Sequence, residues 1–108
     1  MRRTNAGIAG NGGCPYSVTV QIEFTVQTWR EGNQYIAHAM PLDVASAGET
    51  PAAARAALDE AVHLFLRTAA EQGTLADVLE EVGYAAEGTG WRSPAWVGIE
   101  RACASVAA

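Results

Sequence analysis

Residues Leu42 to Leu66, LDVASAGETPAAARAALDEAVHLFL, contain the clearest structural signal in the chain. The apolar residues before Gly48 predict a short strand, and Thr50 followed by Pro51 predicts the first turn of a helix. A Thr hydroxyl can accept a hydrogen bond from a free N–H of that turn. Proline fits the next position because its φ is already helical and its missing N–H has no partner there. We expect Gly48 to take a positive φ at the corner between strand and helix.

The residues before this stretch alternate with the period of a β-strand. From Ser17 to Trp29, apolar and polar side chains occupy successive positions, which is typical of a strand with one buried face. Tyr35 to Met40 predicts a second strand after a turn at residues 30–34, and Leu42 to Ala47 predicts a third. Short connections favour a three-stranded antiparallel meander. The first strand is long, and an exposed edge of that length needs covering, which favours a homo-oligomer.

After Thr50 the apolar period changes to that of a helix, from Pro51 to about Gln72. The stripe expected to pack on the sheet consists of Ala54, Leu58, Ala61, Val62, Phe65 and Ala69. Gly73 predicts the end of this helix, and Thr74, with Asp77 three residues later, predicts the cap of a shorter one. The segment from Trp91 to Val106 predicts a final strand that returns to the sheet edge, with the best signal around Trp96 to Cys103 and with Pro94 and Gly98 against it.

The predicted fold class is therefore α+β: a three-stranded antiparallel meander packed by one long helix, then a short helix and a returning C-terminal strand. Residues 1–15 are rich in Gly and Asn and are predicted to form a flexible tail, so that residues 16–108 make one domain.

Composition limits the functional classes. The 108 residues include seven arginines, no lysine and twelve acidic residues, and the formal net charge is −5. An acidic chain repels phosphate, so we expect no direct binding of nucleic acid. The charge is explained either by solubility alone or by a basic protein partner. The sequence shows no signal peptide and no membrane-spanning run, and only two cysteines. We therefore expect a cytoplasmic protein with reduced thiols.

The residues that could carry chemistry lie scattered in the sequence. His38 and His63 occur without the spacing of a metal or catalytic motif, so no metal and no cofactor is predicted. Glu23 and Asp43 could meet across the sheet as a carboxylate pair, which leaves a divalent-metal nuclease as a remote alternative. Trp29, Trp91 and Trp96 are more simply explained as core or interface residues than as a stacking platform for bases.

One sequence of elements resembles the HicB-like antitoxin family: a strand, a turn, the strand YIAHAM, and PLDVASAGETP before an Ala- and Leu-rich helix. The residues that carry the resemblance are Tyr35, Ala37, Pro41, Leu42, Asp43, Val44, Ala45, Ser46, Gly48, Thr50, Leu58, Glu60, Ala61, Leu64, Phe65 and Leu66. The resemblance covers roughly residues 18–83. It implies a partial RNase-H-like fold without nuclease activity. The chain departs from the family at Ala52 and Ala53, where acids commonly follow the Thr, and the family's C-terminal DNA-binding module is expected to be missing.

The family resemblance implies a function that composition alone does not. Members neutralise a small basic mRNA-cleaving HicA-type toxin by binding it, so a basic RNase toxin is the expected partner and the chain is expected not to be an enzyme. The predicted partner-facing residues are Asp43, Ser46 and Glu49. Leu64, Trp29 and Trp96 are the predicted oligomer interface. The alternative is a stand-alone oligomeric binding or structural module of the same fold without a toxin partner.

Overall fold

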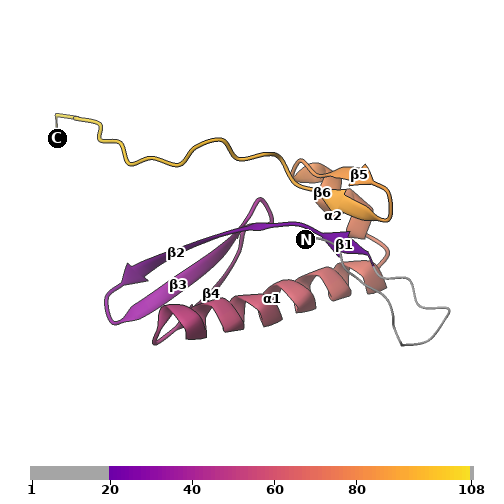
Figure 1. Cartoon of the computed structure of the whole chain (residues 1–108), viewed down its shortest axis with the longest axis horizontal. Coiled ribbons are helices and arrows are strands. Elements are labelled where there is room, and N and C mark those ends of the chain that lie inside the picture. The colour runs from indigo at the N-terminus through magenta and orange to yellow at the C-terminus, as the bar shows by residue number, and fades with distance from the viewer. Residues whose placement is uncertain (1–19, 108) are drawn as a thin grey trace.

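The computed structural model describes residues 20–107 and shows an α+β fold (Figure 1). Three antiparallel strands, β2 (Thr25–Glu31), β3 (Gln34–Met40) and β4 (Val44–Gly48), form a sheet in the order β2-β3-β4. The long helix α1 (Pro51–Glu71) packs along one face of this sheet. The predicted fold class is confirmed. The predicted tail at residues 1–15 lies outside the described residues.

The register of the three strands decides which side chains meet α1. Val26 of β2 and Val44 of β4 both lie opposite Ala39 of β3. Ala37 and Ala39 have no exposed surface, so small side chains let the helix approach the centre of the sheet. The other face of the sheet carries the alternate residues and has no helix over it. We call it the open face; it is made of Thr25, Gln27, Trp29, Glu31, Gln34, Ile36, His38, Met40, Ala45 and Ala47.

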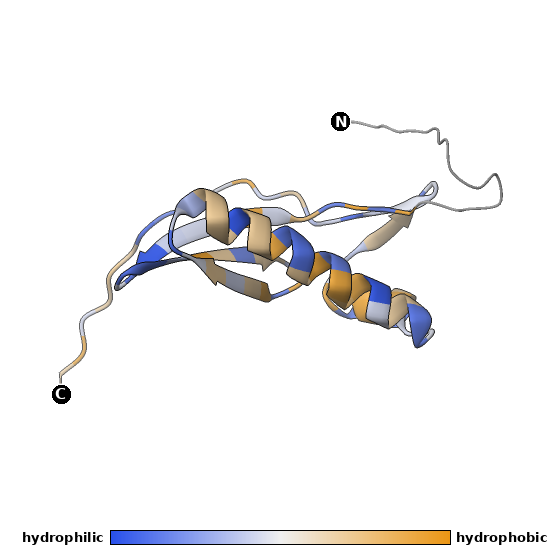
Figure 2. Cartoon of the chain, turned by 90° about the horizontal axis from the view of Figure 1, so that it is seen from below, coloured by the Kyte–Doolittle hydropathy of each residue, from blue (hydrophilic) through white to orange (hydrophobic). Residues whose placement is uncertain are grey.

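Helix α1 begins and ends where the sequence predicts. The backbone N–H of Ala53 donates to the Thr50 hydroxyl at 3.0 Å, and Pro51 occupies the first helical turn. Gly73, with a φ of 74°, follows the helix. Ala54, Leu58, Val62 and Ala69 are buried on the predicted stripe. Figure 2 shows that the outer face of α1 carries hydrophobic residues among hydrophilic ones.

The corner between β4 and α1 differs from the prediction in one respect. Gly48 is not among the residues with positive φ. A Cβ at this position would instead lie 2.5 Å from the Ala54 nitrogen and 2.7 Å from the Ala53 carbonyl carbon. Glycine is therefore required by the close approach of strand and helix backbones, and a positive φ plays no part.

A second, smaller sheet follows α1. After helix α2 (Leu75–Glu81), strands β5 (Ala85–Glu87) and β6 (Gly90–Arg92) form a hairpin, and β6 pairs in parallel with β1 (Gln21–Ile22). Thr74 precedes α2, but its side chain caps no N–H of that helix; its hydroxyl donates to the Ala69 carbonyl at 3.3 Å instead.

Several predicted strand boundaries are wrong. The turn predicted at residues 30–34 is shorter, because β2 continues to Glu31 and β3 begins at Gln34. The strand predicted from Ser17 to Trp29 is interrupted at residues 23–24, between β1 and β2, and residues 17–19 lie outside the described part of the chain. The third strand begins at Val44, because residues 41–43 form a turn. No strand occurs at Trp96–Cys103. The chain does return to pair with its first strand, but it does so earlier, through β6.

The segment Ser93–Ala107 is extended and leaves the body of the protein (Figure 1). It contains Pro94, which has no N–H to donate to a ladder and so disfavours continuation of β6. We call this segment the C-terminal arm. Among the helices of residues 20–107, none combines the length and the apolar character needed to cross a membrane.

Candidate functional site

The most connected polar cluster joins Gln27 and His38 of the open face to Asp43 of the adjoining turn. Gln27 of β2 and His38 of β3 are directly opposite in the antiparallel register. Asp43 lies in the turn that joins β3 to β4, where its backbone N–H donates to the Ala39 carbonyl at 2.8 Å. Two strands and one turn therefore bring together side chains that are up to 16 positions apart in the sequence.

Asp43 has an unusual backbone conformation for a residue with a side chain. Its φ is 62°, in the left-handed region, which Asp and Asn tolerate better than most residues. The Asp43 side chain lies at the exposed rim of the turn, where 88% of it is accessible. Its hydrogen bond to His38 holds the carboxylate in place. His38, in contrast, is only 18% accessible.

The hydrogen bonds assign a role to each ring nitrogen of His38. The Gln27 amide nitrogen lies 3.0 Å from Nδ1, and an amide nitrogen can only donate. Nδ1 is therefore the acceptor, and Nε2 carries the proton and donates to Asp43 Oδ1 at 2.7 Å. Because both ring nitrogens are engaged, neither is free to take a proton from a substrate. The chemically available group of the cluster is the Asp43 carboxylate, which can accept charge-assisted hydrogen bonds from an Arg or Lys.

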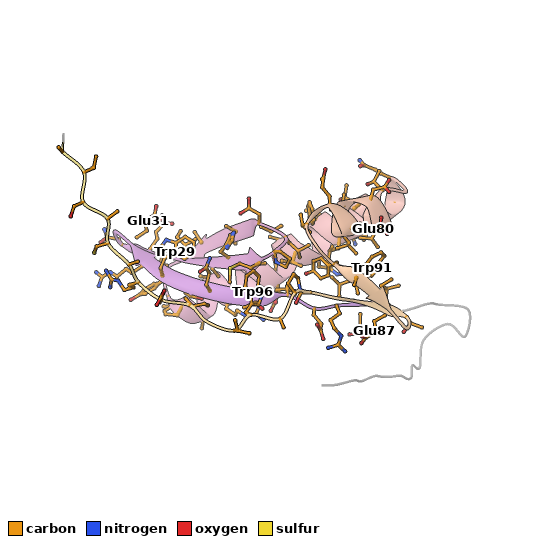
Figure 3. All side chains as sticks on the ribbon, turned by 90° about the horizontal axis from the view of Figure 1, so that it is seen from above. Trp29, Glu31, Glu80, Glu87, Trp91 and Trp96 are labelled. Atoms are coloured by element: carbon orange, nitrogen blue, oxygen red, sulfur yellow. The ribbon has the colours of Figure 1, made fainter. Side chains whose placement is uncertain are left out.

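Trp29 borders this cluster on β2. Its ring centroid lies 6.1 Å from that of His38 with an interplanar angle of 57°. The indole N–H donates to Glu31 at 3.0 Å, and the side chain remains 40% exposed. Figure 3 shows Trp29 and Glu31 near the same end of β2. The open face thus offers an apolar ring beside a carboxylate, a combination suited to binding another protein.

The structure separates the three predicted partner-facing residues. Asp43 precedes β4 and Glu49 follows it, so about 20 Å of extended strand lies between them. Ser46 is opposite Ala37, on the face that α1 covers, and is half-buried. Only Asp43 and Glu49 are exposed, and they lie at opposite ends of the same edge strand.

The three residues predicted for an oligomer interface also come from separate elements. Trp29 lies on the open face, Leu64 on α1, and Trp96 on the C-terminal arm. They are 40%, 55% and 45% exposed, respectively. All three are large apolar side chains in contact with solvent, but α1 and the open face lie on opposite sides of the sheet.

The carboxylates of Glu23 and Asp43 each have a different neighbour. Glu23 Oε2 lies 3.9 Å from an Arg92 nitrogen, whereas Asp43 binds His38. Within the described residues, no group of three or more His, Cys, Asp or Glu side chains is arranged to hold a metal ion. The two carboxylates considered from the sequence thus each pair with a different basic residue.

A second surface feature was not predicted. A hollow of about 650 Å³ lies between the residues around β1 and the β5–β6 hairpin, and both Arg55 and Arg92 line it. Arg55 pairs with Asp59, and Arg92 pairs with Glu87, whose hydrogen bond and charge raise the pKa of Arg92. Each guanidinium group already pairs with a carboxylate, so neither Arg55 nor Arg92 is available in the hollow to bind an anion.

The sequence patterns placed His38 and Asp43 separately and did not predict the contact between their side chains. The signal that could have joined them is the turn at Pro41, which folds residue 43 back beside the strand that contains residue 38.

Comparisons of this chain with models of protein families, with curated proteins and with solved structures found no match.

Proposed function

We propose that the chain is a non-enzymatic, HicB-like antitoxin-type protein that binds and neutralises a small basic mRNA-cleaving toxin of the HicA type. The observation that carries the proposal is the charge of the described residues. All twelve acidic residues lie in residues 20–107 but only five of the seven arginines do, so this part has a net charge of 5 − 12 = −7. Complementary charge accelerates the encounter with a basic partner.

The distribution of the acidic residues supports a protein partner. Four of them face an Arg or His within the chain: Glu23, Asp43, Asp59 and Glu87. The other eight are exposed and form no ion pair within residues 20–107. An ion pair with a partner's Arg or Lys would therefore compete with no existing pair at most of these positions. A partner that cleaves mRNA would place the complex in the cytoplasm.

The open face is the part of this surface that we assign to the partner. It combines the fixed, exposed carboxylate of Asp43 with the half-exposed ring of Trp29. Arginine can donate to a carboxylate through two N–H groups and stack on an aromatic ring with the same guanidinium plane. A basic toxin whose active site contains Arg or Lys would be blocked by docking on this face.

The test is co-expression with the product of a neighbouring gene for a small basic protein. We expect the two proteins to purify together and the growth arrest caused by the toxin to be relieved. Asp43→Ala should weaken the complex, whereas Asp59→Ala, which removes an exposed carboxylate from α1, should leave it nearly unchanged. If the chain neither captures such a product nor relieves its toxicity, the antitoxin proposal fails.

A stand-alone oligomeric binding module is the second candidate. It is supported by the exposed apolar side chains of Trp29, Leu64 and Trp96, which a monomer would leave in water. This candidate predicts stable self-association without a basic partner. Self-association together with the absence of any neighbouring toxin gene would favour it over the antitoxin proposal.

A further inference from the structure

The C-terminal arm exposes most of the large apolar surface of the described chain. Of seven exposed large hydrophobic residues, four lie on the arm: Trp96, Val97, Ile99 and Val106. Val97 is 101% exposed and Ile99 is 72% exposed. Both are β-branched residues that favour strands, yet no strand is formed between residues 93 and 107. The arm therefore has strand-forming residues and no partner strand.

Within residues 20–107, one edge of the sheet has no strand beside it. β2 pairs only with β3 in this part of the chain, so its outward-facing N–H and C=O groups have no neighbouring strand there. A free edge of this kind is a template for strand addition. Figure 1 shows β6 and the arm on one side of the line from β1 to β2, and β3 and β4 on the other side.

The register of β6 indicates how a strand would lie on this edge. β6 pairs in parallel with β1, with Gln21 opposite Gly90 and Ile22 opposite Trp91. The Glu23 N–H donates to the Trp91 carbonyl at 3.3 Å. If the arm continued this register along β2, Trp96 would face Gln27 and Val97 would face Thr28. The arm does not follow its own β2 edge, because residues 93–107 form no strand and β2 pairs with β3 alone among the described residues.

We propose that the arm of one copy pairs with the free β2 edge of a second copy, and that the exchange is reciprocal. A second copy supplies both missing partners at once, because each copy has one unpaired arm and one unpaired edge. Each copy can offer at most fifteen arm residues and seven β2 residues, 22 in all, to this interface. This upper limit falls within the range of a stable interface, which has about 20–30 residues a side. A two-fold dimer of this kind uses the same surfaces in both copies.

Trp29 explains where the apolar ring of Trp96 would be buried. Trp29 lies on β2, is 40% exposed, and faces away from α1. In the register of β6, Trp96 would lie opposite Gln27, on the same side of the sheet as Trp29, whereas Val97 and Ile99 would lie opposite Thr28 and Arg30, on the side of α1. Leu64 is exposed on α1, away from the β2 edge, and remains exposed in the dimer.

The test measures the mass of the chain alone by light scattering over a concentration series. We expect a dimer of twice 11.3 kDa for the natural sequence. The double variant Val97→Asp, Ile99→Asp should raise the dissociation constant by at least about tenfold, as expected for central apolar contacts. Leu64→Asp is the matched control and should leave the dimer intact. A dimer lost in Leu64→Asp but kept in the double variant overturns the proposal.

Hydrogen exchange identifies the edge that is used. In the natural dimer we expect slow exchange at outward-facing amides of β2, and faster exchange there in the double variant, while the amides of α1 stay equally protected in both. If the chain is monomeric at every concentration and its β2 amides are protected, the arm folds onto the β2 edge of its own chain. The proposed swap of arms between two copies is then wrong. These measurements need no toxin, so their outcome is independent of the antitoxin proposal.

Discussion

The Tyr84 hydroxyl donates a hydrogen bond to the backbone carbonyl of Glu23, a residue 61 positions earlier in the chain. This bond joins the segment after α2 to the interruption between β1 and β2. Tyr84 is 5% exposed and belongs to the main hydrophobic core. The contact explains why the first strand is interrupted here, since the Glu23 carbonyl is used by a side chain.

We expect Tyr84→Phe to destabilise the protein by about 1–2 kcal/mol, because it leaves a partly buried carbonyl without its donor while changing little volume. Urea unfolding followed by circular dichroism measures the effect. Tyr35→Phe is the matched control: Tyr35 is half-buried and has no side-chain hydrogen bond within the described residues, so its free energy of unfolding should change by less than about 0.5 kcal/mol. Equal effects of the two substitutions would contradict a structural role for the Tyr84 hydroxyl.

The same residue predicts a dependence of stability on high pH. Burial first, and the charge of Glu23 second, raise the pKa of Tyr84 from 10.0 to about 12. A raised folded-state pKa means that the unfolded chain loses the proton more readily, so this contribution to stability is complete below pH 10 and declines as the pH rises toward 12. The chain has no lysine, so no side-chain amine titrates in this window.

The measurement is the urea midpoint between pH 9 and pH 12, compared with Tyr84→Phe. We expect the natural sequence to lose its advantage over Tyr84→Phe across this window. A constant difference between the two proteins would show that the Tyr84 hydroxyl titrates at its ordinary pKa.

The sequence predicts the elements whose signals are local. Thr50 and Pro51 specify the start of α1 by their own chemistry, and the apolar period around Leu58 specifies which face is buried. The interruption after β1 has no local signal, because it depends on Tyr84. The alternation of apolar and polar residues alone predicts that the strand continues through residues 23–24. The β5–β6 hairpin was not predicted, although Gly88, with a φ of 61°, lies at the first position of a two-residue turn.

The candidate site shows the same limit more clearly. Gln27, His38 and Asp43 are each ordinary surface residues when considered singly. Their contact depends on the register of β2 against β3 and on the turn at residues 41–43, and neither follows from spacing. Asp43, Ser46 and Glu49 were predicted to form one partner-facing edge because they are close in sequence to the corner before α1, but an extended strand separates Asp43 from Glu49 by its full length.

Gly48 provides a test of the corner between β4 and α1. We expect Gly48→Ala to cost about 3 kcal/mol, because the new Cβ would be 2.5 Å from a backbone nitrogen that cannot move without displacing α1. Gly32→Ala is the control: its φ is 64° but nothing lies within 4 Å, so only the conformational cost of about 1 kcal/mol should appear. Thermal and urea unfolding measure both. The reverse order would contradict the close approach at Gly48.

Thr50 tests the start of α1. Its hydroxyl accepts from the Ala53 N–H at 3.0 Å, so Thr50→Ala should cost about 1 kcal/mol of unfolding free energy. Thr50→Ser keeps the oxygen and should change the free energy of unfolding by only a few tenths of that amount. The two variants are compared by urea unfolding, with helix content checked by circular dichroism. If Ser fails to restore stability, the Thr contribution lies in its methyl group and not in the cap.

Asp43 combines a left-handed backbone with a side-chain hydrogen bond, and three substitutions separate the two. Asp43→Ala removes the bond to His38 and keeps a Cβ at a φ of 62°, whereas Asp43→Gly removes the bond but relieves the backbone. We therefore expect the glycine variant to be more stable than the alanine variant by about 1 kcal/mol. Asp43→Asn retains an oxygen that can accept from Nε2 and a residue that tolerates this φ, so it should lie closest to the natural sequence.

Nitrogen NMR of the His38 ring checks the hydrogen-bond part directly. The natural protein should show the tautomer with its proton on Nε2, held by Gln27 on one side and Asp43 on the other. In Asp43→Gly the tautomer with its proton on Nε2 should no longer be the dominant form of the ring, whereas Asp43→Asn should preserve it. If Gly and Ala variants are equally stable, the left-handed conformation is not retained at residue 43, and the exposed carboxylate that we assign to the partner would lose its fixed position.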